Sequence, residues 1–270
     1  MEKIRLLFLA ASPKVSPLGL DEEIREITAK IRAAEYRDSI EVISKWAVRP
    51  DDLHQALLEC RPHVLHFSGH GTQSQELVLL DSNGDPKPVS KAAIVDLMRV
   101  LQDNLRLVVL NACFSRPQAD AITQVIDCAI GMDREVGDEA AIKFAAAFYR
   151  AIGFGRSIQT AFDLGRSSLL LEGIPEGNTP KLMFRTGVDP ASIGLIHPSE
   201  KGPSLTTERT TRPGGGGAST NAGASKAVNM WRQKLAFLEE QEAIVSDPAQ
   251  KFALLKQIEE ASAKIKELGG

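Results

Sequence analysis

Short apolar runs alternate with amphipathic stretches along residues 4–187. The runs predict β-strands, and the stretches between them repeat apolar residues every three or four positions, which predicts helices. In the first stretch the apolar stripe consists of Leu20, Ile24, Ile27 and Ile31. The predicted strands are residues 4–10, 40–48, 63–68, 105–112, 127–131 and 181–185. The predicted helices are residues 21–32, 51–60, 90–102, 138–152 and 157–172.

A turn motif interrupts this alternation after the third strand. Residues 76–81 and 88–89 are strand-like segments on either side of SNGD, residues 82–85. Asn-Gly supplies the positive φ values that a tight hairpin turn needs. These residues therefore predict a β-hairpin.

Strands separated by helices predict an α/β fold with a mostly parallel central sheet covered by helices on both faces. In such sheets the chemistry collects at the carboxyl ends of the strands. His70 follows the strand at 63–68, and Cys113 follows the strand at 105–112. These two residues are therefore the leading candidates for a functional site.

The composition changes sharply after residue 198. We expect a folded domain at 1–198, a flexible linker at 199–226 and a two-helix module at 227–270. The linker is rich in Gly, Ser, Thr and Ala and cannot bury enough apolar surface to fold. Within the module, Asp247-Pro248 separates two amphipathic patterns, which predicts an αα-hairpin. Such a hairpin has little core of its own, so we expect it to pair with a partner or a second copy.

Charge, apolar runs and cysteine usage narrow the range of functions. A net charge of −3 with scattered basic residues gives no reason to expect nucleic-acid binding. The apolar run at the N-terminus is too short for a signal peptide, and no run approaches the roughly 18 residues of a membrane span. The three cysteines are odd in number and lack a CxxC spacing, which disfavours disulfides and zinc sites. We therefore expect a cytoplasmic, reducing setting without a membrane partner.

The segment VLHFSGHGTQ, residues 64–73, ends a strand with an imidazole between two glycines. His70 either packs or caps locally, or is held at the strand end to move a proton. The flanking glycines favour the second role because they let backbone and substrate approach closely. His66 forms an HxxxH pattern with His70, but that spacing suits metal binding on a helix. We expect His66 to pack in the interior or to support His70.

The segment LVVLNACFS places Cys113 where an apolar strand stops. Free cysteines in apolar settings are usually small hydrophobes, which is the role we expect for Cys60 and Cys128. A free thiol has a pKa of about 8.5 and needs an imidazole nearby to be a good nucleophile at pH 7. His70 and Cys113 on neighbouring strand ends predict a Cys–His dyad without an evident third member.

These two segments resemble the catalytic segments of caspase-like cysteine proteases, and most closely those of CHAT domains, the branch related to separase. The resemblance covers about residues 3–187, including LLFLAASP, SNGD and GDEAAIKFAAAFYRAI. It implies a caspase-like three-layer sandwich. Caspases carry QACxG at the cysteine, whereas this chain has NACFS, so caspase-type aspartate specificity is not implied.

The resemblance also implies roles for individual residues. Cys113 would be the nucleophile and His70 the general base or acid, while the backbone amides of Gly71 and Cys113 would form the oxyanion hole. IGMDREVGDEA resembles the separase stretch whose aspartate receives a basic side chain at P1, the residue before the cleaved bond. That aspartate is Asp133 here, with Met132 in place of the usual aromatic residue. The alternative for Asp133 is that it caps the following loop or faces water. No metal or organic cofactor is implied.

The C-terminal module resembles effector-associated helical modules of bacterial conflict systems, which tether an effector to a partner bearing a matching copy. The alternative is a simple dimerising coiled coil, and either arrangement raises local concentration across the linker. If P1 is basic, Arg209 and Arg212 in the linker are candidate self-cleavage points.

The combined expectation is an intracellular cysteine endopeptidase that acts on a protein substrate through a thioester and is recruited by a sensor or adaptor through residues 227–270. Its setting would be bacterial immunity or signalling. A catalytically silent CHAT-fold adaptor is the alternative, and retention of both His70 and Cys113 argues against it. A nucleotide-using effector is disfavoured because the chain has neither GxxxxGK[ST] nor a GxGxxG after the first strand.

Overall fold

The computed structural model describes residues 3–14, 16–100 and 102–196, together with Ile258, Ser262 and Lys266. The chain divides into two compact units, Met1–Pro203 and Ser204–Gly270. The predicted linker at 199–226, with Arg209 and Arg212, lies outside the described residues. The predicted module at 227–270 also lies outside them, apart from those three positions.

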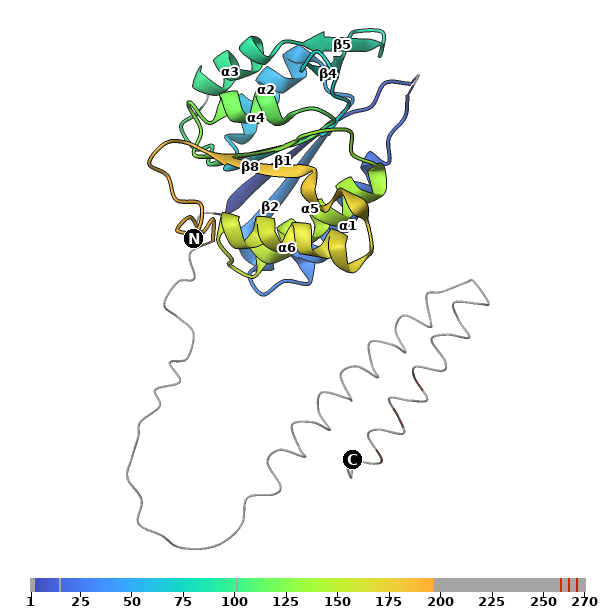
Figure 1. Ribbon diagram of the computed structural model, residues 1–270, viewed down its shortest axis with the longest axis vertical. Coiled ribbons are helices and arrows are strands. Elements are labelled where there is room, and N and C mark those ends of the chain that lie inside the picture. The colour runs from blue at the N-terminus through green and yellow to red at the C-terminus, as the bar shows by residue number, and fades with distance from the viewer. Residues whose placement is uncertain are drawn as a thin grey trace, which may run out of the picture. The chain divides into compact units, whose positions relative to one another are not determined.

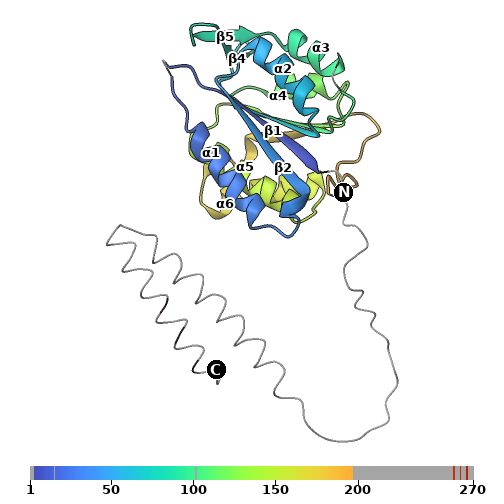
Figure 2. The ribbon, with the colours of Figure 1, turned by 180° about the vertical axis from the view of Figure 1, so that it is seen from behind.

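The first unit is built on a six-stranded sheet with the strand order β2-β1-β3-β6-β7-β8 (Figures 1 and 2). All neighbouring pairs are parallel except β7 and β8, which are antiparallel. The prediction of a mostly parallel sheet is confirmed. The strands are β1 Ile4–Ala11, β2 Ile40–Trp46, β3 Val64–Gly69, β6 Leu107–Asn111, β7 Cys128–Met132 and β8 Pro180–Phe184.

Helices cover the sheet on both faces, as Figure 1 shows. One face carries α1 Leu20–Arg32, α5 Asp138–Gly153 and α6 Ile158–Leu171. The opposite face carries α2 Pro50–Cys60, α3 Lys91–Val100 and α4 Arg116–Ile122. Each helix layer packs its apolar residues on the sheet, so the described part of this unit has two cores separated by the strands. The central strands are buried on both sides, which explains their continuous apolar runs. The predicted three-layer α/β sandwich is confirmed.

Two details differ from the sequence prediction. Helix α4 was not predicted, because a seven-residue helix is too short to show a clear apolar period. The predicted hairpin does form, from β4 Leu77–Leu80 and β5 Pro86–Val89. Its turn was predicted wrongly, however: Gly84 has a positive φ of 84°, whereas Asn83 does not. The Asp81 carboxylate accepts the amides of Asn83 and Asp85 instead, which organises a longer loop.

No helix within the described ranges combines the length and apolar character that a bilayer crossing requires.

Candidate active site

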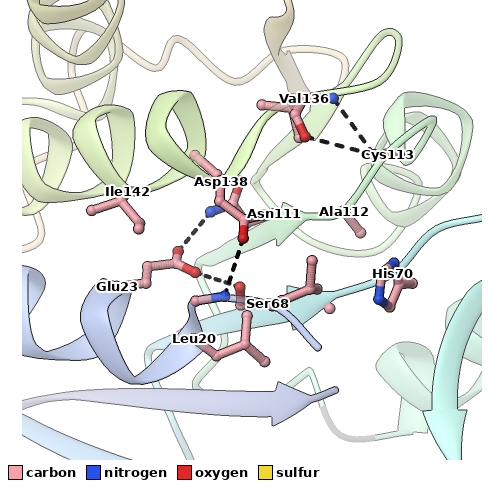
Figure 3. A pocket seen from close by; sticks show the side chains of 14 residues that line it. Leu20, Glu23, Ser68, His70, Asn111, Ala112, Cys113, Val136, Asp138 and Ile142 are labelled. Atoms are coloured by element: carbon pink, nitrogen blue, oxygen red, sulfur yellow. Dashed lines mark hydrogen bonds between the residues drawn. The ribbon is translucent and has the colours of Figure 1, made fainter. Parts of the chain in front are cut away.

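The sheet places His70 and Cys113 at the same edge. Strands β3 and β6 are parallel neighbours with Ser68 opposite Asn111, and each strand ends within a residue of that pair. His70 and Cys113 follow these ends and line one cavity, which we call the strand-end cavity (Figure 3). Its walls also come from the loop before α1 and from the start of α5. The lining residues are Leu18, Gly19, Leu20, Glu23, Ser68, Gly69, His70, Asn111, Ala112, Cys113, Val136, Asp138, Ala141 and Ile142.

A backbone carbonyl orients the His70 ring. The Nε2 atom of His70 lies 2.8 Å from the carbonyl oxygen of Ser16, in the loop between β1 and α1. A carbonyl oxygen accepts hydrogen bonds but cannot donate, so Nε2 carries a proton. In the neutral ring, Nδ1 is then the nitrogen that can accept one. The Ser16 carbonyl therefore orients the imidazole in the way that a third member of a triad would.

The Cys113 thiol is half-buried and has a hydrogen-bond donor beside it. The amide nitrogen of Val136 lies 3.5 Å from Sγ, and the carbonyl oxygen of the same residue lies 3.9 Å from it. The other two cysteines are buried, which confirms the prediction that they are small hydrophobes. Burial raises the pKa of the Cys60 thiol and raises the pKa of Cys128 to about 12. Of the three cysteines, all within the described residues, Cys113 alone lines the strand-end cavity.

The backbone amides of Gly71 and Cys113 have no acceptor within the part of the chain that the structure describes. Gly71 sits in an isolated bridge opposite Leu77, but the hydrogen bonds that flank it are made by residues 70, 72, 76 and 78. Gly71 packs directly against the Cys113 peptide. Phe114, the next residue, adopts a left-handed φ of 55° and turns the chain immediately after the thiol. Two amides without acceptors thus lie beside the candidate nucleophile.

Asp133 does not line the strand-end cavity. Its carboxylate accepts a hydrogen bond from Arg116 at 2.8 Å, and this contact lowers the pKa of Asp133. The ion pair lies in a separate depression, the Asp133 hollow, lined by Gln73, Gln75, Phe114, Arg116, Pro117, Asp120 and Asp133. Phe114, which lines this hollow, follows Cys113 of the strand-end cavity directly in the chain. Met132 is fully buried in the core beneath them and lines neither.

A buried polar network lies under the strand-end cavity. Glu23 is 2% exposed, and its carboxylate accepts hydrogen bonds from Ser68 Oγ and, at 2.6 Å, from Asn111 Nδ2. Its Oε1 atom also lies 2.9 Å from Nε2 of His66, whose Nδ1 lies 3.0 Å from the Tyr149 hydroxyl. His66 is fully buried and stacks on Phe8, so the prediction that it packs in the interior is confirmed.

Sequence reasoning missed Glu23, Ser68 and Asn111. The sequence did carry one indication of Glu23, namely its position on α1. The buried residues of that helix are Leu20, Glu23, Ile27 and Ile31, so Glu23 is the charged member of an otherwise apolar stripe. A carboxylate inside an apolar stripe needs partners from elsewhere in the fold. Ser68 and Asn111 showed a weaker feature: each is a polar residue within an apolar strand, two positions before a candidate catalytic residue.

No group of three or more His, Cys, Asp or Glu side chains in the described ranges is arranged to hold a metal ion.

The sequence of this chain was compared with models of known protein families. Residues 7–175 match the model of the CHAT domain, a segment that covers more than half of the chain and contains both His70 and Cys113. This chain belongs to the CHAT domain family. The matched segment contains helices α1 to α6 and strands β2 to β7, and it begins within β1 and stops before β8.

Two curated proteins are similar to part of this chain. A Roc-COR-CHAT protease from an unknown prokaryotic organism is 26% identical over 179 residues, which are 63% of this chain and 17% of that protein. A probable protease from Gillisia limnaea is 27% identical over 150 residues, which are 54% of this chain and 26% of that protein. The chain thus spans about a quarter or less of the length of these relatives.

Two solved structures are also similar, each at 11% identity. The complex of the Porphyromonas gingivalis RgpB pro- and mature domains gives a TM-score of 0.47 over 67% of this chain and 47% of that chain. Caspase-1 from Spodoptera frugiperda gives a TM-score of 0.46 over 68% of this chain and 86% of that chain.

Proposed function

We propose that this chain is a cysteine endopeptidase in which His70 and Cys113 form the catalytic dyad. The observation that carries the proposal is that both side chains line one cavity at the carboxyl ends of neighbouring parallel strands. The names of the two curated relatives, both proteases, support it further.

The arrangement supports the following reaction. Nδ1 of His70 accepts the thiol proton, and Sγ of Cys113 attacks the carbonyl carbon of the peptide bond. As the new S–C bond forms, the carbonyl oxygen becomes an oxyanion, and the Gly71 and Cys113 amides are placed to donate to it. The C–N bond then breaks, and the leaving amine takes the proton from His70. Water, deprotonated by His70, hydrolyses the thioester, which releases the acid product and restores the thiol.

We propose further that the enzyme cleaves after Arg or Lys, with Asp133 as the acid that recognises this side chain. The Asp133 hollow contains two carboxylates, Asp120 and Asp133, against one guanidinium among its lining residues, so it keeps an acceptor for a second cation. The Arg116 side chain is half-exposed, and its ion pair with Asp133 lies near the surface, so a substrate cation can displace it. Charge-assisted hydrogen bonds to a carboxylate suit both Arg and Lys.

Residues 227–270 are proposed to recruit the protease to a protein partner, either a sensor or adaptor or another copy of this chain. The support is the amphipathic pattern of the two predicted helices. The relatives extend far beyond the matched segment, which fits a protease domain that works beside other modules. The proposed setting is a bacterial immunity or signalling system.

The proposal is tested with a peptidyl acyloxymethyl ketone that carries Arg at P1. Such reagents alkylate an activated catalytic thiol, and intact mass followed by peptide mapping locates the adduct. We expect one adduct at Cys113, none in Cys113→Ala, and much slower labelling in His70→Ala. Absence of any adduct in the folded wild type would favour the catalytically silent adaptor.

A further inference from the structure

Glu23 is a buried carboxylate in the wall of the strand-end cavity that the proposed reaction does not use. Removing an ionised carboxylate from water is unfavourable unless hydrogen bonds or an opposite charge compensate it. Among the described residues, the side chains that contact this carboxylate include His66 but no Lys or Arg. A buried carboxylate without a Lys or Arg partner lowers the stability of the fold unless other groups compensate it. The groups that contact Glu23 therefore indicate its role.

The donors to Glu23 come from the two strands that carry the dyad. Ser68 lies on β3, two residues before His70, and Asn111 ends β6, two residues before Cys113. Each of these side chains donates to one of the two oxygens of the same carboxylate, as Figure 3 shows. Glu23 therefore bridges the ends of β3 and β6 at the point where the chain leaves the sheet for the dyad.

His66 and Tyr149 hold the carboxylate from the other side. Burial, together with the charge of Glu23, raises the pKa of Tyr149 well above its ordinary value, so its hydroxyl stays protonated. Nε2 of His66 donates to the Glu23 carboxylate, and Nδ1 of the same ring lies 3.0 Å from the Tyr149 hydroxyl. His66 therefore gives Glu23 a third contact, whereas Tyr149 contacts only the other nitrogen of that imidazole.

We propose that Glu23 is a positioning residue for the His70–Cys113 dyad. Its carboxylate ties the ends of β3 and β6 together and so holds the imidazole and the thiol in reacting geometry. Glu23 hydrogen-bonds to neither of them, so it acts through two residues of backbone on each strand. The proposal rests on the proposed function for the reaction that it serves, but dyad alignment can be measured without peptide cleavage.

Three variants separate positioning from general stability. Glu23→Gln keeps the shape, and because the Ser68 hydroxyl can accept as well as donate, the amide can meet the same three partners. Glu23→Ala removes all three bonds. Tyr149→Phe is the matched control, since it removes a hydroxyl from an equally buried site in the same network that bonds to neither Ser68 nor Asn111.

The primary measurement is the rate at which iodoacetamide alkylates Cys113 in the full chain at neutral pH, followed by peptide mass spectrometry. The ratio of the wild-type rate to that of His70→Ala gives the acceleration due to the dyad. We expect Glu23→Ala to lose this acceleration, while Glu23→Gln and Tyr149→Phe keep it within about threefold of the wild type. In peptide cleavage, we expect Glu23→Ala to lower kcat by about 10²-fold, the effect of a 1 Å misplacement, with KM changed little.

Thermal unfolding checks that each variant is folded at the assay temperature. If Glu23→Ala does not fold, Ser68→Ala and Asn111→Ala each remove one strand-end tie, and each should lower the acceleration.

The outcomes distinguish this proposal from the proposed function. A folded Glu23→Ala variant that keeps the acceleration of Cys113 alkylation would overturn the positioning role of Glu23. An equal loss of acceleration in Tyr149→Phe would also overturn it, because that result would indicate a general effect on the core. A wild-type thiol that reacts no faster than in His70→Ala also overturns it, because there is then no aligned dyad to hold. If the alkylation rate depends on Glu23 in a protein that cleaves no peptide, that result would support the positioning role of Glu23 and contradict the proposed protease function.

Discussion

Gly71 and Cys113 are in direct backbone contact: a Cβ atom at Gly71 would lie 1.9 Å from the carbonyl oxygen of Cys113. Such a distance is far inside van der Waals contact, so only glycine fits at this position. The proposed oxyanion donors are the amides of these same two residues. Their close packing therefore sets the spacing of the two donors.

Gly71→Ala is expected to separate these backbones and to misplace one donor. Removing one oxyanion donor typically lowers kcat by about 10²–10³-fold, and we expect an effect of that size. Steady-state kinetics on a cleaved peptide measure it, with circular dichroism to check the fold. The control is Gly194→Ala, whose added Cβ would be 3.6 Å from its nearest neighbour, an ordinary contact. Full activity in Gly71→Ala would argue against this oxyanion hole.

Asp133→Asn is expected to weaken cleavage after Arg and Lys. Hydrogen bonds to charged groups contribute about 1.5–3 kcal/mol, so kcat/KM for these substrates should fall by about 10–100-fold. Substrates with an uncharged P1 residue should change little. Asp96→Asn is the matched control, because Asp96 also pairs with an arginine, Arg99, but lies outside the Asp133 hollow. An equal loss for every P1 residue, or no loss at all, would remove Asp133 from the role.

The pKa of Cys128, raised by burial to about 12, makes stability depend on pH in the alkaline range. In the unfolded chain this thiol titrates near 8.5, so between about pH 8.5 and 12 the unfolded state binds fewer protons than the native state. The free energy of unfolding then falls as pH rises, by at most about 1.4 kcal/mol per pH unit from this group. The stabilisation is complete below pH 8.5 and is lost toward pH 12.

Urea unfolding of wild type and Cys128→Ala from pH 7 to pH 11 measures this effect. The stability difference between the two proteins should be constant up to about pH 8 and shrink above pH 9. Ile130→Val, a change at a buried position on the same strand without a titrating group, should give a difference independent of pH. A constant difference for Cys128→Ala would contradict the raised pKa.

The sequence predicted the strands, the longer helices and the two dyad positions because these depend on local patterns. Apolar runs define the buried strands, and in a parallel sheet the residues that follow two neighbouring strands must emerge at one edge. His70 and Cys113 could therefore be paired in advance from their places at strand ends.

The supporting contacts could not be predicted, because they join residues far apart in sequence. Glu23 is separated from Ser68 by 45 positions and from Asn111 by 88, so their meeting depends on strand order and helix placement. The position of Asp133 outside the strand-end cavity could not be predicted either. Its partner Arg116 belongs to helix α4, which the sequence did not predict. The hairpin turn differed because the Asp81 side chain competes with the local preference of Asn-Gly.

The most direct test of the central claim is a panel of fluorogenic peptides that differ only at P1, assayed with wild type and Cys113→Ala. The full chain is used, both alone and fused to an oligomer so that residues 227–270 are brought together. We predict cleavage after Arg or Lys by the wild type and none by Cys113→Ala. Cleavage that persists in Cys113→Ala, or no cleavage by the folded wild type in any assembled form, would contradict a His70–Cys113 protease.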